Sequence, residues 1–150
     1  MGKHVLRYLR GTSGYGLWYR QEDEVKLCGF MDADWAGSPT ERKSTSGGIF
    51  SIGSTTVSWY SRKQRSVALS SAEAEYMVAS LAACEAIWMR KILVGLFGSH
   101  LDPTVIHCDN HSCIKLSANP VFHDRSKHIA SGTIISKIVC SGESCYFHTF

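Results

Sequence analysis

The sequence has 150 residues, the length of one domain, with 44% hydrophobic and 19% charged residues. This composition excludes a disordered chain, a fibrous repeat and a domain that needs disulfides or metals in order to fold. The formal net charge of +3 permits a nucleic-acid partner without requiring one, because sixteen Lys and Arg face thirteen Asp and Glu.

The chain carries no signal of secretion or of membrane insertion. Its six cysteines have no regular spacing and form no CxxC pair, which favours idle thiols in a reducing compartment. The first ten residues lack an apolar signal-peptide core, and the longest apolar run, 77–97, is interrupted by Glu85, Arg90 and Lys91. We therefore expect an intracellular chain without a membrane partner, in a cytoplasmic particle or the nucleus.

The first half of the chain predicts mainly strands. KHVLRYLR (3–10) has the pattern of the end of an amphipathic helix, and it precedes an expected short strand at 16–19. VKLCGFM (25–31) is predicted as a buried strand. After a polar loop, IFSI (49–52) and TTVSWYS (55–61) form an expected hairpin around a Gly-Ser turn.

The second half changes to helical periodicity. Residues 70–97 predict a long helix, on which Met77, Leu81, Cys84 and Trp88 recur at helical spacing. TVIHCD (104–109) is predicted as a strand and NHSCIKLSAN (110–119) as a short helix. The order predicts an α/β domain with a mixed sheet, in which strands one to three are antiparallel and strand four is parallel. We expect the tryptophans Trp35, Trp59 and Trp88 in the core.

Two aspartates follow predicted strands. Asp32 comes directly after the strand at 25–31, and Asp109 closes the strand at 104–109. In an α/β sheet, ligands gather at the ends of neighbouring strands. Each aspartate alone is equally explained as the start of a turn or as a helix cap.

A glutamate at the start of the long helix strengthens the case for a site. Ser70 and Glu73 have the spacing of a capping box, so Glu73 already has a structural role. Glu75 shares a helix face with the small residues Val78, Ala79, Ala82 and Ala86, which predicts that it points toward the sheet.

Three carboxylates that converge at one edge of a sheet imply a compensating cation. Oxygen ligands favour Mg²⁺ or Mn²⁺, and two such ions can activate a water and stabilise a leaving oxygen in phosphodiester hydrolysis. A salt-bridge network with Arg42, Lys43 or Lys63 is the structural alternative.

The sequence resembles the ribonuclease H domain of the Pol polyprotein of copia-type LTR retrotransposons. The resemblance is carried by four stretches: DADWAGSPTERKSTSGGIFSIGSTTVSW, KQRSVALSSAEAEYMVAS, EAIWMRKIL and IHCDNHSCIKLSANPVFHDRSKHI. It implies a five-stranded mixed sheet flanked by helices. It also implies cleavage of the RNA strand of RNA·DNA hybrids during reverse transcription, with two Mg²⁺ (or Mn²⁺) ions and a reverse transcriptase domain in the same polyprotein.

By position in these motifs, the resemblance assigns the catalytic and metal-binding carboxylates to Asp32, Glu75 and Asp109. Asp34 and Glu73 are the neighbours most easily confused with them, and Asp34 ranks second because it shares a strand face with Asp32.

Seven residues are candidates for contacts with the nucleic-acid backbone and 2′-hydroxyls, and ordinary solvated surface is the equal alternative. They are Arg42, Lys43, Ser44, Thr45, Arg62, Lys63 and Arg65. For Asn110, a helix cap is favoured over a role in ligand binding. The histidines at positions 107, 111, 123 and 128 are expected to be structural or exposed.

The chain departs from the family after Ile129. We expect residues 1–20 to be the remnant of a segment that connects to reverse transcriptase, residues 21–129 to form the ribonuclease H-like domain, and residues 130–150 to be an aberrant tail. The family continues with a last strand and a last helix that carries a fourth carboxylate, and both are expected to be missing here. A frameshift or a splice error near Ala130 would explain the difference.

Two alternatives to an active enzyme follow. Without the fourth carboxylate and the last strand, the chain is expected to have low stability and little or no activity, as a degenerate retrotransposon fragment that at most binds nucleic acid weakly. The third interpretation, an isolated nucleic-acid-binding module of a host, depends only on the basic clusters.

Overall fold

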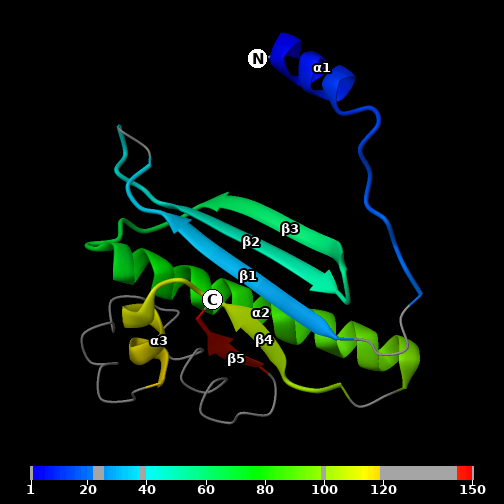
Figure 1. The fold of residues 1–150 in the computed structure, drawn as a ribbon. Coiled ribbons are helices and arrows are strands. Elements are labelled where there is room, and N and C mark those ends of the chain that lie inside the picture. The colour runs from blue at the N-terminus through cyan, green and yellow to red at the C-terminus, as the bar shows by residue number, and fades with distance from the viewer. Residues whose placement is uncertain (1, 22–25, 38–39, 99–100, 119–144, 150) are drawn as a thin grey trace.

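Five strands form one mixed sheet in the computed structural model, which describes residues 2–21, 26–37, 40–98, 101–118 and 145–149. The strands are β1 (Leu27–Asp34), β2 (Thr45–Ile52), β3 (Thr55–Lys63), β4 (Thr104–His107) and β5 (Cys145–His148). Their order across the sheet is β3-β2-β1-β4-β5 (Figure 1). β1, β2 and β3 are antiparallel neighbours, whereas β4 runs parallel to β1 and β5 parallel to β4. The predicted mixed α/β fold is therefore confirmed.

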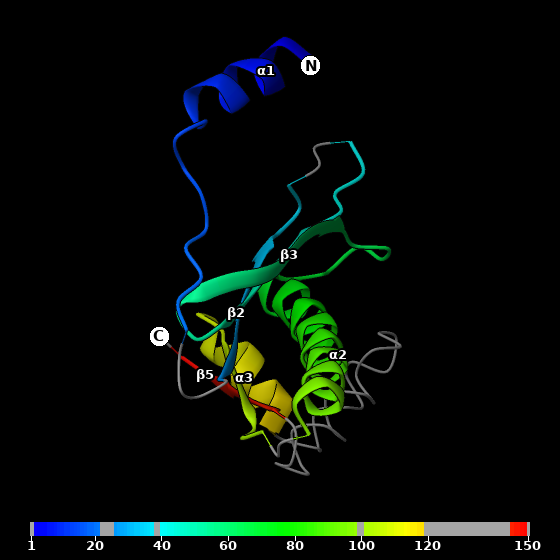
Figure 2. The ribbon, with the colours of Figure 1, turned by 90° about the vertical axis from the view of Figure 1, so that its right-hand side faces the viewer.

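The helix α2 (Ser71–Phe97) lies along one face of this sheet, and α3 (His111–Ala118) packs beside it (Figure 2). Ser70 caps α2, because its Oγ accepts a hydrogen bond of 3.2 Å from the Glu73 N–H. Glu73 Oε2 in turn accepts the Leu69 N–H at 2.6 Å. The predicted cap at Ser70 is confirmed, while Glu73 closes the turn one residue earlier than a standard capping box.

The face of α2 that packs on the sheet is built from small side chains. Val78, Ala79, Ala82 and Ala86 are completely buried, as predicted, and pack in the core cluster with Phe50 and other sheet residues. The stripe of larger residues at helical spacing lies away from this face, since Met77 and Leu81 are half-buried and Cys84 and Trp88 are exposed. Small residues occupy the buried face of α2 because they let the helix axis approach the sheet closely.

The expectation of a tryptophan core is wrong. Trp35, Trp59 and Trp88 are 46%, 69% and 57% exposed. Trp59 alternates onto the face of the sheet opposite α2, and Trp35 lies past the end of β1, where its Nε1 donates to the Ala68 carbonyl at 3.3 Å. The core is instead filled by Phe50, Tyr76 and Ile106 together with the alanines of α2.

The first segment forms the helix α1 (Gly2–Gly11), which has no buried residue and stands apart from the sheet in both views (Figures 1 and 2). The strand expected at 16–19 does not form. This segment is held to β3 through side chains, because Thr55 Oγ1 donates to the Trp18 carbonyl at 2.7 Å and Tyr19 OH to the Thr56 carbonyl at 3.4 Å. Without a backbone ladder to a neighbour, an extended segment is not a strand.

The expectation that the last strand is missing is wrong. Cys145–His148 pairs in parallel with β4, and the Cys108 N–H donates to the His148 carbonyl at 2.9 Å. An extended segment with alternating burial can pair with the backbone N–H and C=O groups at the edge of β4. Cys145 is completely buried in this position. An unpaired β4 is therefore no longer a reason for low stability.

The expected loss of the last helix falls on residues 119–144, which lie outside the described residues. The division of the chain at residues 20 and 129 stays a prediction, although residues 145–148 of the expected tail belong to the sheet. In the described part of the chain, no helix is long and apolar enough to cross a membrane.

Candidate metal centre

Asp32 and Asp34 lie inside β1 and not beyond its end. The strand continues to Asp34 because its pairing with β2 continues as far as Asp34↔Thr45. Strand alternation places Asp32 and Asp34 on one face with Phe30, and all three are exposed. Ala33, between them, points toward α2.

Asp109 reaches the same edge of the sheet from β4. The parallel register pairs Phe30 with His107, and Asp32 and Asp109 each follow two residues later, Asp32 within β1 and Asp109 just past the end of β4. Asn110 then caps α3, since its Oδ1 accepts the N–H groups of Ser112 and Cys113 at 3.0 and 3.1 Å. The predicted cap is confirmed, and it orders the turn that carries Asp109.

Glu75 connects α2 to β1. Its side chain is only 5% exposed, and its Oε1 accepts the Ala33 N–H at 3.0 Å. The other oxygen, Oε2, is buried and has no hydrogen-bond partner among the described residues. A buried carboxylate oxygen without a donor is costly, so this oxygen is the strongest structural sign of a cation-binding site.

Burial raises the pKa of Glu75 to about 7. The hydrogen bond from the Ala33 N–H opposes this shift in pKa, and the negative charges of Asp109 and Asp32 contribute to it. The three carboxylates that the sequence selected are thus close enough to interact electrostatically, and a divalent cation among them would stabilise the ionised form of Glu75.

The closest group of ligand atoms includes a residue that the sequence analysis missed. Glu75, Cys108 and Asp109 each offer one ligand atom, and these atoms lie within 4.8 Å of one another. Asp32 is not in this group, although its charge acts on Glu75. Cys108 immediately precedes Asp109 in the chain, but its thiol carries no local signal that distinguishes a ligand from a buried core residue.

The neighbouring carboxylates have other roles. Glu73 is occupied by the start of α2, through its contact with the Leu69 N–H. The Asp34 carboxylate lies against the backbone of Gly37, where even an added Cβ would overlap with it. These contacts give Glu73 and Asp34 structural roles, while the choice of Glu75 and Asp32 as site residues stays a prediction.

Gln64 is a second residue that the sequence analysis missed. Its Nε2 donates to Ser46 Oγ at 3.1 Å and to the Ala74 carbonyl at 3.0 Å, and its N–H donates to the Ser44 carbonyl at 2.8 Å. Gln64 thereby joins β2 to the first turn of α2, directly beside Glu75. In the sequence it is one polar residue within a basic run, so only the fold reveals its position.

The basic residues form ion pairs with Glu41 and Glu85 and not with the three candidate carboxylates. Lys63 Nζ lies 2.8 Å and Lys43 Nζ 4.0 Å from Glu41 Oε2, and Arg62 lies 3.7 Å from Glu85 Oε1. In the described part of the chain, no ion pair joins Asp32, Glu75 or Asp109 to these cations, so the alternative salt-bridge network is not formed.

The same cations flank the carboxylate end of the sheet. Asp34 pairs with Thr45, and Thr45 pairs with Lys63 across β2. Arg42 and Arg65 are exposed beside them, whereas Ser44 is completely buried and its Oγ accepts the Ala36 N–H at 3.1 Å. The Ser44 hydroxyl therefore supports the loop and is not available at the surface.

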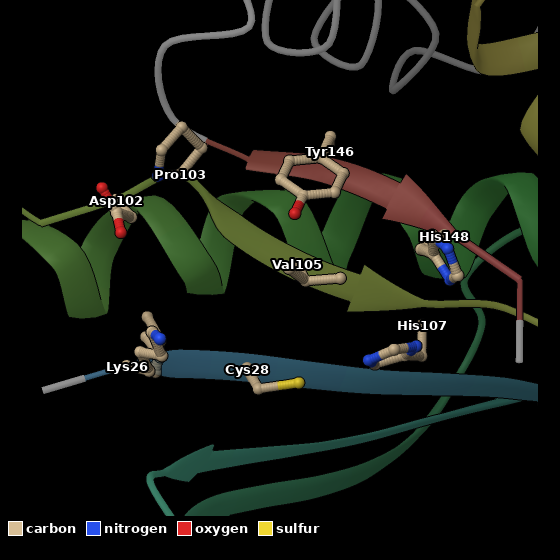
Figure 3. Close-up of a pocket in the computed structure, with 9 residues that line it drawn as sticks. Lys26, Cys28, Asp102, Pro103, Val105, His107, Tyr146 and His148 are labelled. Carbon is tan, nitrogen blue, oxygen red and sulfur yellow. The ribbon is translucent and has the colours of Figure 1, made fainter. Parts of the chain in front are cut away.

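A pocket of about 460 Å³ lies elsewhere, between β1, β4 and β5 (Figure 3). Lys26, Cys28, His107, Tyr146 and His148 are among the residues that line it. The His107 ring stacks on the Phe30 ring with 4.8 Å between their centroids, and it meets the His148 ring edge-on with 5.8 Å between centroids. His107 is thus packed against rings in a pocket that none of the three carboxylates lines.

Two curated relatives match most of the chain. It is 43% identical over 128 residues to "Retrovirus-related Pol polyprotein from transposon RE2" of Arabidopsis thaliana, and 44% identical over 127 residues to that from transposon TNT 1-94 of Nicotiana tabacum. Each match covers 85% of this chain and 9% of the relative, so the chain spans about a tenth of their length. No family model matches the sequence.

The solved structures with a similar fold include the ribonuclease H domain of prototype foamy virus. The TM-score is 0.58 at 12% identity, and the match covers 85% of this chain and 79% of that domain. At this identity the likeness concerns the fold alone.

Proposed function

Because the chain is homologous to a segment of copia-type retrotransposon Pol polyproteins and has the ribonuclease H fold, we propose that it is a metal-dependent nuclease domain. Its substrate is the RNA strand of an RNA·DNA hybrid, and its place is beside the reverse transcriptase domain of a longer polyprotein. The observation that carries this proposal is the buried Oε2 of Glu75, which has no hydrogen-bond partner in the part of the chain that the structure describes; the charges of Asp109 and Asp32 act on the same carboxylate.

Asp32, Glu75 and Asp109 would hold Mg²⁺ or Mn²⁺. The carboxylates support hard cations, since Glu75 on α2 interacts electrostatically with Asp32 on β1 and with Asp109 just past β4. When bound, a pair of such ions activates a water for attack on the phosphodiester and stabilises the leaving oxygen. The protein positions the ligands: the Ala33 N–H holds Glu75, and Gln64 and Asn110 hold the turns on either side.

The exposed cations at the same end of the sheet would bind the hybrid. Arg42, Lys43, Arg62, Lys63 and Arg65 are proposed to contact phosphates, and Thr45 lies among them. Their ion pairs with Glu41 and Glu85 are at the surface and are therefore weak enough to exchange for phosphate. Ser44 supports this loop through Ala36.

A second candidate function is hybrid binding without cleavage. It is favoured by one observation, that the closest ligand group contains the thiol of Cys108 and not the carboxylate of Asp32. In this case the basic side chains bind the phosphate backbone of the hybrid, and no hydrolysis follows.

The test is cleavage of a labelled RNA·DNA hybrid by the full chain in Mg²⁺, compared with its Asp109→Asn variant. We expect a loss of at least about 100-fold, because metal stabilisation of the transition state is worth several kcal/mol. Asp102→Asn, the same change at an exposed aspartate away from the centre, is the matched control and should retain the parent rate. Salt-dependent binding without cleavage by the parent chain would instead support the second candidate.

A further inference from the structure

The thiol of Cys108 is placed as a potential metal ligand. Cys108 is completely buried at the end of β4, and its Sγ lies within 4.8 Å of ligand oxygens of both Glu75 and Asp109. These residues come from β4, its following turn and α2, so the tertiary structure brings a sulfur and two carboxylates together.

An independent observation indicates that this cluster is built for a ligand. Glu75 is 95% buried, and Oε1 is fixed by the Ala33 N–H while Oε2 has no hydrogen-bond partner among the described residues. The unsatisfied oxygen therefore belongs to a residue of the cluster itself. Asp109 is exposed, so the cluster has an open side through which an ion can enter.

The donor set does not suit all divalent cations equally. Sulfur is a soft ligand that Mg²⁺ and Mn²⁺ bind poorly, whereas Zn²⁺ and Cd²⁺ accept thiolate together with carboxylate. Zinc binds sulfur at about 2.3 Å and carboxylate oxygen at about 2.0–2.2 Å, so tetrahedral ligands lie roughly 3.5 Å apart. From the present separations of at most 4.8 Å, shifts of about an ångström, including one of the exposed Asp109 side chain, would close the site.

We propose that Glu75, Cys108 and Asp109 form a binding site for a thiophilic divalent cation, Zn²⁺ or Cd²⁺, with Cys108 Sγ as a direct ligand. On binding, the thiol releases its proton to solvent and the thiolate coordinates the ion. The site shares Glu75 and Asp109 with the proposed nuclease centre, but the inference does not depend on hydrolysis.

The test is a titration of the full reduced chain with CdCl₂, followed by the near-ultraviolet absorption of the cadmium–thiolate bond, with ZnCl₂ affinity measured by calorimetry. We expect Cys108→Ser to remove the high-affinity absorption step and to weaken Zn²⁺ binding at least about 10-fold. Cys84→Ser, an exposed thiol, and Cys28→Ser, a half-buried thiol on β1, are the matched controls and should retain both signals, because neither belongs to the ligand group. Circular dichroism checks that each variant folds.

Asp109→Asn keeps the inference testable if Cys108→Ser does not fold, because Asp109 is exposed. It should retain the absorption step but weaken Zn²⁺ affinity several-fold, whereas Asp102→Asn should not. The inference is overturned if Cys108→Ser binds like the parent, if Cys84→Ser or Cys28→Ser loses the step, or if Asp109→Asn leaves the affinity unchanged. None of these results depends on cleavage, so a failure here is distinct from a failure of the nuclease proposal.

Discussion

Glu75 is the residue on which the candidate centre depends most. Its buried side chain bridges α2 and β1 through the Ala33 N–H, and the charges of Asp32 and Asp109 act on it. The sequence analysis selected Glu75 over Glu73 because the cap at Ser70 accounts for Glu73, and the hydrogen bonds of Glu73 support that reasoning. The roles of Cys108 and Gln64 could not be predicted from the sequence, because their partners are residues distant in the chain or atoms of other elements.

Removal of divalent cations should make stability depend on pH through Glu75. The pKa of Glu75 is about 7 in the folded chain and about 4.5 in the unfolded chain. Protonation of Glu75 therefore makes its full contribution to stability below pH 4.5, and this contribution is lost as the pH rises through 7. We expect the free energy of unfolding to fall by at most about 3 kcal/mol over this range. Urea denaturation at pH 5 and pH 8 in EDTA measures the difference.

Glu75→Gln is the comparison for this prediction, because it keeps the shape and removes the charge. The variant should lose most of the pH dependence. An unchanged pH dependence in Glu75→Gln would contradict the assignment of the effect to this carboxyl.

Gln64→Leu should destabilise the start of α2. The change removes the donor to Ser46 Oγ and the Ala74 carbonyl, and the expected cost is about 1–3 kcal/mol for buried acceptors left unpaired. Thermal or urea unfolding measures it. The same substitution at the exposed Gln21 is the control, and an equal effect at both positions would show that the hydrogen bonds of Gln64 contribute nothing.

At the scale of the elements, local sequence rules predict where α2 begins and ends. The errors in the predicted strands arise where a strand depends on pairing with a neighbouring strand. The long helix begins at its predicted cap and ends at Gly98, whose φ of 63° is left-handed. β1 was predicted too short, because an acidic tip such as DAD is disfavoured in a strand until β2 pairs with it. The short strand at 16–19 was predicted from composition, but no neighbouring strand forms a ladder with it.

The glycine pair of β2 offers an element-scale prediction with a built-in control. An added Cβ at Gly48 would overlap with the Tyr60 ring, whereas an added Cβ at Gly47 would lie 3.7 Å from the Asp32 carbonyl oxygen, an ordinary contact distance. Gly48→Ala should therefore destabilise the sheet by about 1–3 kcal/mol through overpacking, while Gly47→Ala should be neutral or stabilising. Chemical denaturation of both variants measures this, and equal effects would argue against close packing of Tyr60 on β2.

For the whole molecule, the two faces of the sheet differ. α2 and α3 cover one face (Figure 2). The other face exposes Phe30, Ile49 and Trp59, which the register places side by side on β1, β2 and β3. The carboxylates lie at one end of this arrangement, with the exposed cations of the β2 and β3 ends beside them. Ligands and cations thus share one end of the sheet, which is the arrangement that a polyanionic substrate with bound metal ions requires.

Binding of an RNA·DNA hybrid should weaken with salt through these cations. Lys63→Gln should lower the affinity and reduce the slope of log K against log salt by about 0.9 or less for the lost phosphate contact. Fluorescence anisotropy at several salt concentrations measures it. Lys91→Gln on α2 has the same change of charge away from this end of the sheet, and an equal loss there would mean that only net charge matters.

The sequence by itself determined the α/β class, the extent of α2 and its cap, the order of the first four strands and the three candidate carboxylates. These depend on periodicity and on spacing within a few residues, which the chain carries locally. Only the tertiary structure decided that Ala33 binds Glu75 from 42 positions away, that Cys108 joins the ligand group, that the tryptophans lie at the surface and that residues 145–148 complete the sheet. Burial and pairing of this kind depend on which segments meet in space, and no local pattern encodes that meeting.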